Sequence, residues 1–517
     1  MFKRLFCKLI PAFLLVILLA SSLTVGASSE ALRVALPANP DVLDPALTAD
    51  GNSAVVMSNV MEGLLGIDQN SGELLPVLAK NWEVAEEGKV FTFHLREGVQ
   101  FHDGTKFDAE AVKFNMERQM VPNETEGMPY ADQIYGKVEK IEVLDEYTLK
   151  VTLKSPDITF LTGLAQMPGA PIVSPKALKE DPDEFKKDPV GTGPFQFVEW
   201  VPDQYVKVEA FEEYWGGRPK VDQVIYKVIK DAAARTSALL AGEIDILPWV
   251  DISHVERLEK SEMNVISKPG WTLSYIAFYT DQKPFSDKRV RKAVFMGVNR
   301  KELVQGLYGD DAVVAQGIIP PTMVGGREEL SPPPYDPQRA KQLLKEAGYE
   351  DGLSFKLLAY NVSKNYNPAA EKLALVIKDQ LKDIGVEVDV IVKPWNEFLS
   401  ALFSEGHKVA DAVQIGWGST TGDPSSFTLL LRSKNVGTGL NFAEYQNEEL
   451  DQLAEKAKRV ADQDKRAEIY KEIQQIVIED LPWLFVSHGT DYHATRPDVV
   501  GYGEGIGNKL VDVYIED

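Results

Sequence analysis

The residue patterns that most often catalyse hydrolysis are missing from this sequence. It contains no Gly-x-Ser-x-Gly turn and no His-Glu-x-x-His helix, and its single cysteine is Cys7, so three common routes to hydrolysis are absent. None of the six histidines pairs at the spacing of a helical or loop metal site: His94, His102, His254, His407, His488 and His493. We therefore predict no catalytic residue, no metal site and no cofactor. For His488 and His493 we favour a structural role, and a nickel-type ligand role stays open.

Aromatic and small polar residues gather where a predicted strand ends. Residues Ala410 to Ile415 have the pattern of a strand, Trp417 follows it, and a polar loop comes next, Gly418-Ser419-Thr420-Thr421-Gly422. Ligands of open α/β sheets bind beyond the carboxyl ends of the strands. We therefore expect Trp417, Ser419 and Thr420 to line a binding cleft, with core packing as the other interpretation of the tryptophan.

Three further residues near strand ends have two interpretations each. Asp423 could meet a ligand, but it precedes Pro424 and an apolar stretch, the pattern of a helix cap, so we interpret it as structural. Trp395 follows a predicted strand, and its position alone is typical of a core aromatic that starts a helix. Trp249 ends a strand of the first half and either faces the cleft or packs under a loop. Exposed aromatic rings would stack on peptide side chains and on sugars alike.

The second half of the chain has the elements that would position these residues. Leu353 to Ala359 reads as a strand, Asn367-Pro368 opens an amphipathic helix, and Val386 to Val390 resumes a strand. This is a βαβ unit, and Ala410 to Ile415 adds another parallel strand. After Asn447 two amphipathic helices precede a strand at Leu484 to Ser487.

The first half mixes hairpins with one further strand-helix-strand unit. The hairpins pair Trp82 to Val84 with Val90 to Phe93, and Val138 to Val143 with Tyr147 to Leu153. The unit runs through Val221 to Ile229, Ala232 to Ala241 and Ile244 to Leu247, which predicts parallel pairing. Two α/β lobes with a return crossing near the C-terminus predict a hinged cleft.

Length and charge narrow the class of protein. A chain of 517 residues exceeds one core and predicts two or three domains. Its formal charge of −23 argues against nucleic acid and anionic lipid as partners. The acidity carries no information about the solute, since one cleft can differ in sign from the whole surface.

The N-terminus has the pattern of a cleaved export signal. Lys3, Arg4 and Lys8 form a basic start, Phe13 to Ala20 an apolar core, and Val25-Gly26-Ala27 a small-residue cleavage site. No later stretch approaches the roughly 20 apolar residues of a spanning helix. We expect a mature chain that begins after Ala27 and does not insert into a membrane.

Several short stretches, found in order along nearly the whole mature chain, resemble one known family. The first-half stretches are Leu78-Ala79, Trp82 to Val84, Phe91 to Arg96, Phe101 to Thr105, Gly191 to Phe195 and Tyr214-Trp215. The second-half stretches are Phe285 to Ala293, Asn299-Arg300, Gly416-Trp417 and Gly422-Asp423-Pro424. Together they resemble the peptide and nickel class of bacterial extracellular solute-binding proteins, often called family 5.

The resemblance implies a fold and a division of the chain. The fold would be α/β, the two-lobe periplasmic-binding-protein or Venus flytrap fold, with an extra antiparallel subdomain in the first lobe and closure by a hinge. The crossings between lobes should lie near Pro269 to Phe278 and Val486 to Tyr492. We expect a signal peptide at residues 1–27, lobe I at 28–269 with the subdomain at about 63–182, lobe II at 270–485, and a C-terminal return to lobe I at 486–517.

The resemblance also assigns roles in the cleft. In the dipeptide-binding branch, a carboxylate three residues after the tryptophan grips the free amine of the ligand, and here that position is Thr420. Lys364 aligns with an arginine that holds the ligand carboxylate, although a solvated surface lysine is the alternative. Trp395 resembles a residue that walls the cleft. The loss of the acid at Thr420 predicts weak selection for a free amine.

These residues lead to one functional expectation and its alternatives. We expect a binding protein that captures a short peptide and delivers it to the permease subunits of an ABC importer, not an enzyme. No cysteine follows the apolar core to carry a lipid anchor, which favours a periplasmic location, and we expect a monomer. A receptor for an oligosaccharide or another non-peptide solute is the main alternative; a nickel-chelate receptor and an exported hydrolase are weaker ones.

Overall fold

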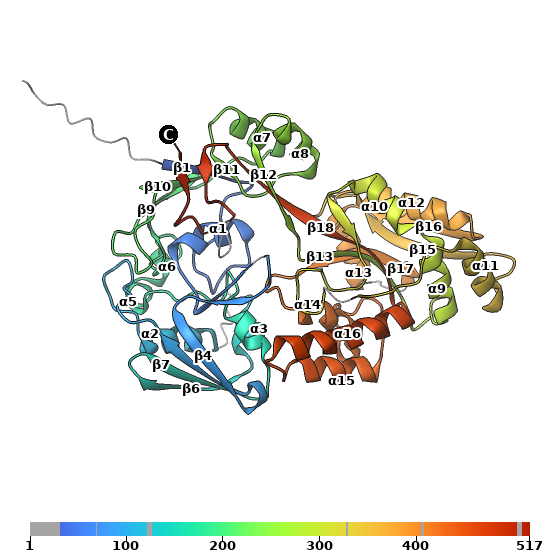
Figure 1. Cartoon of the computed structure of the whole chain (residues 1–517), viewed down its shortest axis with the longest axis horizontal. Helices are drawn as coiled ribbons and strands as arrows, with labels where there is room; N and C mark the ends of the chain where they lie inside the picture. Colours follow the sequence, from blue (N-terminus) through green and yellow to red (C-terminus); the bar gives the residue numbers. More distant parts are fainter. Residues whose placement is uncertain are drawn as a thin grey trace, which may run out of the picture.

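The described part of the chain forms two lobes joined by long strands (Figure 1). The computed structural model describes residues 31–68, 70–120, 127–326, 329–404, 408–503 and 509–516. The expected signal peptide with Cys7, and His407, lie outside these described residues. Within them, no helix is both long and apolar enough to cross a membrane.

Lobe I is built on a mixed sheet with the order β11-β1-β10-β9-β8. These strands are β1 (Ala31–Leu36), β8 (Phe195–Val201), β9 (Tyr205–Ala210), β10 (Gln223–Val228) and β11 (Ile246–Leu247). Strand β1 pairs in parallel with both β10 and β11. The parallel direction predicted for the strand-helix-strand unit is therefore confirmed, but β1 lies between its two strands. Leu32 and Leu36 are fully buried, as expected of a strand in the middle of a sheet.

The first lobe also carries a separate antiparallel sheet with the order β4-β5-β7-β6. It consists of β4 (Ala79–Ala85), β5 (Val90–Leu95), β6 (Val138–Asp145) and β7 (Thr148–Leu153). Both predicted hairpins are present, β4 with β5 and β6 with β7. The other elements of lobe I before the crossing are α1 (Gly51–Val60), β2 (Leu65–Ile67), β3 (Leu74–Pro76), α2 (Ala109–Met120), α3 (Ala131–Tyr135), α4 (Thr159–Gly163), α5 (Pro175–Glu180), α6 (Pro182–Phe185), α7 (Ala232–Leu240) and α8 (Ile252–Glu259).

Lobe II contains the predicted parallel strands. Strand β15 (Leu353–Tyr360) pairs in parallel with β16 (Val386–Lys393) on one side and with β17 (Ala412–Gly418) on the other. Helix α12 (Ala370–Lys382) connects β15 to β16 and buries Leu373, Ile377 and Leu381, so the βαβ unit is confirmed. The other elements of this lobe are α9 (Lys288–Gly297), α10 (Arg300–Tyr308), β14 (Ala312–Val314), α11 (Pro337–Glu346), α13 (Trp395–Ser404), α14 (Ser425–Thr428), α15 (Glu448–Ala457) and α16 (Gln463–Asp480).

Two chain segments connect the lobes, and both lie where the sequence predicts crossings. The first is β12 (Asn264–Pro269) followed by β13 (Thr272–Phe278), and the second is the long strand β18 (Trp483–Thr495). One part of β18 pairs with β13 and β14 of lobe II, and its end pairs with β11 and β12. The predicted strand at Leu484 to Ser487 is thus one part of a longer strand that runs through both lobes. The chain ends beside lobe I with β19 (Val499–Val500) and β20 (Tyr514–Ile515).

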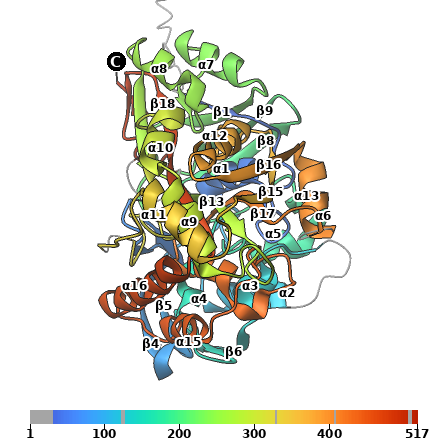
Figure 2. The same ribbon diagram turned by 90° about the vertical axis from the view of Figure 1, so that its right-hand side faces the viewer.

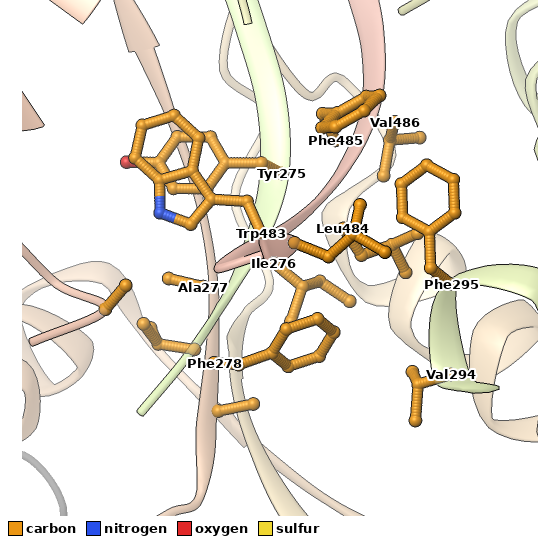
Figure 3. Close-up of a cluster of buried hydrophobic side chains, with 14 of the residues drawn as sticks. Tyr275, Ile276, Ala277, Phe278, Val294, Phe295, Trp483, Leu484, Phe485 and Val486 are labelled. Atoms are coloured by element: carbon orange, nitrogen blue, oxygen red, sulfur yellow. The ribbon is translucent and has the colours of Figure 1, made fainter. Parts of the chain in front are cut away.

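The crossing strands are anchored in the core of lobe II. Tyr275 of β13 and Trp483 of β18 are fully buried and stack with ring centroids 4.1 Å apart. Phe295 of α9 packs edge-on against Phe485 at 4.9 Å (Figure 3). Because these aromatic contacts join both strands to α9, the lobe II ends of the crossing segments belong to a rigid body.

The lobes also touch away from the crossing strands. Helices α15 and α16 lie beside the small sheet of lobe I (Figures 1 and 2). The backbone N–H of Ile158 donates to the carbonyl of Lys458, at the C-terminal end of α15, over 2.7 Å. A space between the lobes is therefore bounded by the crossing strands at one side and by this contact at another.

Candidate functional site

The predicted site residues of lobe II lie at one edge of its sheet. Strands β15, β16 and β17 are parallel, so their carboxyl ends meet at the same edge. Lys364 follows β15, Trp395 follows β16, and Ser419 and Thr420 follow β17. This is the edge at which open α/β sheets bind ligands.

Trp417 is half-buried near the end of β17 and lines the largest of three hollows at the junction of the lobes. We call this hollow of about 670 Å³ the Trp417 cavity; its lining includes Tyr130, Lys137, Trp417, Ser419, Thr420 and Lys434. Part of the indole packs against the lobe II core, so both interpretations of Trp417 hold for different parts of the ring. Thr420, in the loop that follows β17, is exposed.

The backbone of this region depends on a glycine and on a crossing residue. A Cβ on Gly416 would come within 2.1 Å of the ring of Tyr366, so only glycine lets Tyr366 pack across β17. The N–H of Ser419 donates to the carbonyl of Trp271 over 2.8 Å. The Ser419 hydroxyl is buried without a hydrogen-bond partner in the described structure, which leaves a donor and acceptor beside the cavity.

Asp423 is locked in a buried ion pair. Its two carboxylate oxygens accept from Arg466 of α16 over 2.7 Å and 3.0 Å, and one also accepts from the N–H of Ser425 over 2.8 Å. Burial opposes ionisation, but the charge and hydrogen bonds of Arg466 outweigh it and lower the pKa of Asp423. The structural interpretation of Asp423 is confirmed, although the N-cap of α14 is Pro424 and not Asp423. The pair with Arg466 holds the loop after β17 against α16.

Lys364 and Trp395 form one unit. The Lys364 ammonium lies 3.9 Å from the centre of the Trp395 ring, and burial lowers its pKa. Trp395 starts α13 and stacks on Phe398 at 5.5 Å, with Tyr360 edge-on at 5.2 Å. Trp395 is thus the first residue of a helix and packs on core aromatic rings, as one of its two interpretations expected. Its ring also contacts the ammonium of Lys364. Among the described residues, no carboxylate pairs with Lys364, so its charge is available to a solute.

Lys364 lines a second hollow, whose lining residues come from both lobes. We call this hollow of about 250 Å³ the Lys364 cavity; its lining includes Trp249, Asp311, Lys364, Tyr366, Asp491 and Tyr492. Trp249 contributes from lobe I and is 37% exposed, so it faces the cavity and is not packed under a loop. The cavity thus combines aromatic walls with an unpaired cation, as small-molecule sites do.

A third hollow contains residues that the sequence did not single out. We call this hollow of about 140 Å³ the Trp271 cavity; its lining includes Met61, Glu62, Gln166, Trp271, Thr420 and Lys509. Glu62 is fully buried, pairs with Lys509 over 2.6 Å and accepts from Trp215 over 2.8 Å. Trp271 lies between the two strands of the predicted first crossing, and its position beside the hinge was the signal that could have found it.

The described histidines and acids form no metal cluster, and His488, at the crossing between the lobes, makes structural contacts. No three His, Cys, Asp or Glu side chains in the described ranges are grouped so that they could hold a metal ion. His488 is buried and its Nδ1 contacts the carbonyl of Thr272 at 2.9 Å, which ties β18 to β13. Burial lowers the pKa of His488 to about 4, so the ring is neutral near pH 7. Its contacts are those of a structural residue at the crossing.

Comparisons with known proteins agree with this architecture. A model of the bacterial extracellular solute-binding proteins, family 5 Middle, matches residues 73–439. The dipeptide-binding protein of Escherichia coli is 31% identical and covers 90% of this chain and 89% of its own length. Heme-binding protein A of Haemophilus influenzae is 32% identical, over 89% of this chain and 87% of its own. The structure of a dipeptide-binding protein from Pseudoalteromonas sp. SM9913 in complex with Met-Leu has a TM-score of 0.75 and 29% identity, over 94% of this chain and 100% of that chain. The predicted family and two-lobe fold are confirmed.

Proposed function

This chain belongs to the bacterial extracellular solute-binding proteins of family 5, and we propose that it captures a short peptide between its lobes. The observation that carries the proposal is the Lys364 cavity, which has an unpaired cation in lobe II and an exposed tryptophan in lobe I. A peptide carboxylate would pair with Lys364, and its side chains would pack on Trp249 and Tyr366. The similarity to two dipeptide-binding proteins supports the same solute class.

The proposal includes delivery as well as capture. The closed protein would dock on permease subunits of an ABC importer and release the peptide there. The basic start, apolar core and cleavage site at residues 1–27 support export to the periplasm, where the protein would act as a monomer. In this role Trp417, Ser419 and Thr420 would contribute the part of the cleft formed by the Trp417 cavity, and no residue would act as a catalyst.

A second solute class is supported by two observations. Thr420 offers a neutral hydroxyl where a carboxylate would mark a preference for amines, and the Trp417 cavity is large enough for a ring system. A neutral oligosaccharide would fit these features. The relative named for heme binding extends the range of non-peptide candidates.

One experiment separates these candidates. The protein is purified from its native host without refolding and then denatured, and the released solute is identified by mass spectrometry. Recovery of di- or tripeptides supports the proposal, and calorimetric titration of the same peptides into solute-free protein should give a single site. Recovery of sugars or porphyrins alone would refute it. Incubation with chromogenic peptide and glycoside substrates tests the hydrolase alternative, and we expect no turnover.

A further inference from the structure

The Lys364 cavity contains a carboxylate without a partner. Asp491 lies on β18 and is half-buried in the lining of this cavity. Within the described part of the chain, its side chain takes part in no hydrogen bond and no ion pair. Burial raises its pKa, and no cation nearby opposes that effect. A carboxylate in such surroundings is costly unless something else supplies the positive charge.

Two cations, one opposite Asp491 in the strand pairing and one in the cavity lining, are engaged elsewhere. Lys268 is opposite Asp491 in the β12–β18 pairing, but its ammonium donates to the carbonyl of Gly503 over 2.8 Å. Arg235 donates to the carbonyls of Ile229 and Lys230 over 2.8 Å and 2.9 Å. Neither side chain therefore neutralises Asp491.

The other acids of the cavity are also satisfied. Asp311 accepts from the hydroxyl of Tyr492. Asp251 caps α8 and accepts from the N–H of Ser253 over 2.9 Å. Among the charged residues that line this cavity, Asp491 and Lys364 are thus the two that have no polar partner in the described structure, one anion and one cation.

A pair of unmatched opposite charges in one hollow has a simple chemical complement. A zwitterion presents an ammonium and a carboxylate, and each would form a charge-assisted hydrogen bond with the group of opposite sign. The volume of about 250 Å³ lies just below the usual range of ligand sites, about 300–1,000 Å³, which favours a small solute. We propose that Asp491 binds the free ammonium group of the solute while Lys364 binds its carboxylate.

This inference rests on the proposed function and makes it more specific. It moves the recognition of the amine from the loop after β17, where Thr420 is neutral, to the strand that crosses between the lobes. Asp423, the acid closest to Thr420 in sequence, is excluded from this role by its pair with Arg466. Because β18 belongs to both lobes, an ammonium held by Asp491 would lie next to the hinge.

The test is calorimetry with matched peptides on three proteins. The probes are Met-Leu and trialanine, each with a free and with an acetylated N-terminus. The proteins are the wild type, Asp491→Asn, and the control Asp310→Asn, which removes an exposed acid next to the cavity but outside its lining. Asparagine keeps the shape of the side chain, and thermal unfolding verifies that each variant is folded.

We expect only Asp491→Asn to lose affinity, and only for the peptides with a free N-terminus. The wild type should prefer the free amine by at least about tenfold, or about 1.4 kcal/mol. Asp491→Asn should remove that preference by weakening the affinity for free-amine peptides about tenfold, while Asp310→Asn leaves the preference unchanged.

Equal binding of free and acetylated peptides by the wild type would overturn the inference and leave the peptide proposal standing. Tighter binding by Asp491→Asn would also overturn it, because the acid would then oppose the solute carboxylate. If the wild type binds none of the four probes and releases no peptide when denatured, both proposals fail.

Discussion

At the scale of single residues, the proposed function would depend on side chains that the fold leaves without partners. Lys364 and Asp491 are unpaired charges in one cavity, and the Ser419 hydroxyl is a buried group without a hydrogen bond in the described structure. Folded proteins usually satisfy such groups. A bound solute would supply the charges that Lys364 and Asp491 lack in their shared cavity.

The first prediction concerns Trp417. Because Trp417 is only partly buried and lines the Trp417 cavity, Trp417→Ala should weaken solute binding by roughly 1 to 3 kcal/mol, as for other aromatic anchors. Calorimetry measures the affinity, and thermal unfolding measures the stability. Trp82→Ala, a half-buried tryptophan in the small sheet of lobe I, serves as the control and should leave affinity unchanged. A large loss of melting temperature with unaltered affinity would make Trp417 a core residue only.

The sequence predicted some of these residues and missed others for a physical reason. Position after a strand was enough to place Trp395 and Trp417 at one edge of lobe II, because strand direction determines where a following residue lies. Lys364 was found through the family resemblance. It could not identify Asp491, because the role of an acid depends on which cations are already engaged around it. The cations concerned, Lys268 and Arg235, lie on β12 and α7, more than 200 residues earlier in the chain.

At the scale of elements, α16 supports the loop after β17 through the ion pair between Arg466 and Asp423. The pair with Asp423 is almost fully buried, with side chains 3% and 2% exposed. Arg466→Met should lower the free energy of unfolding by about 3 to 5 kcal/mol, since it leaves a buried carboxylate alone. Denaturant titration measures the loss. Arg339→Ala, which breaks an exposed pair with Glu346, is the control and should cost about 0 to 1 kcal/mol.

The same pair should show a defined pH dependence. The pKa of Asp423 is lowered in the folded state, so its contribution to stability is present above the pKa of the unfolded chain, about 3.9. It is lost as the pH falls through the folded-state value. Without Arg466, burial raises the pKa of Asp423 in the variant, so the difference in stability between wild type and Arg466→Met should be largest near pH 7 and shrink as the pH falls. An advantage that persists unchanged at pH 2 would contradict the assignment.

The crossing strand β18 should make stability sensitive to mild acid. The pKa of His488 is about 4 in the folded state because of burial, against about 6.5 for a free histidine. The unfolded chain therefore binds more protons between these values, and unfolding becomes easier as the pH falls from 7 to 4.5. His488→Asn keeps a donor toward Thr272 and should reduce this loss by on the order of 2 to 3 kcal/mol. Denaturation at both pH values measures it, with His94→Asn, on the exposed side of the small sheet, as the control.

At the scale of the whole molecule, the sequence predicted the architecture well because periodicity and order carry that information. The two hairpins and the βαβ unit, predicted from periodicity, are present, and so are both crossings at the places that the family resemblance implies. The insertion of β1 between β10 and β11 was not predicted, since which strands become neighbours depends on packing between distant segments. The length of β18 was also missed, because its pairing changes from one lobe to the other.

The last prediction is closure of the molecule on its solute. The lobes are joined by β12, β13 and β18, and the cavities between them contain unpaired charges from both the hinge strand and lobe II. A solute that pairs with Lys364 and Asp491 interacts more favourably with a state in which lobe I covers the cavity, and it shifts the population toward that state. Small-angle scattering should therefore show a smaller radius of gyration when the solute identified by mass spectrometry is added at saturation.

The control for closure is the same protein with an acetylated peptide that calorimetry shows not to bind, which should leave the scattering profile unchanged. Asp491→Asn at a solute concentration below its own dissociation constant should also remain in the open form. If the free and saturated profiles of the wild type superimpose while calorimetry confirms full occupancy, the lobes do not close. The protein would then bind its solute in a cleft that is already formed, and β18 would be a rigid connection between the lobes with no hinge motion.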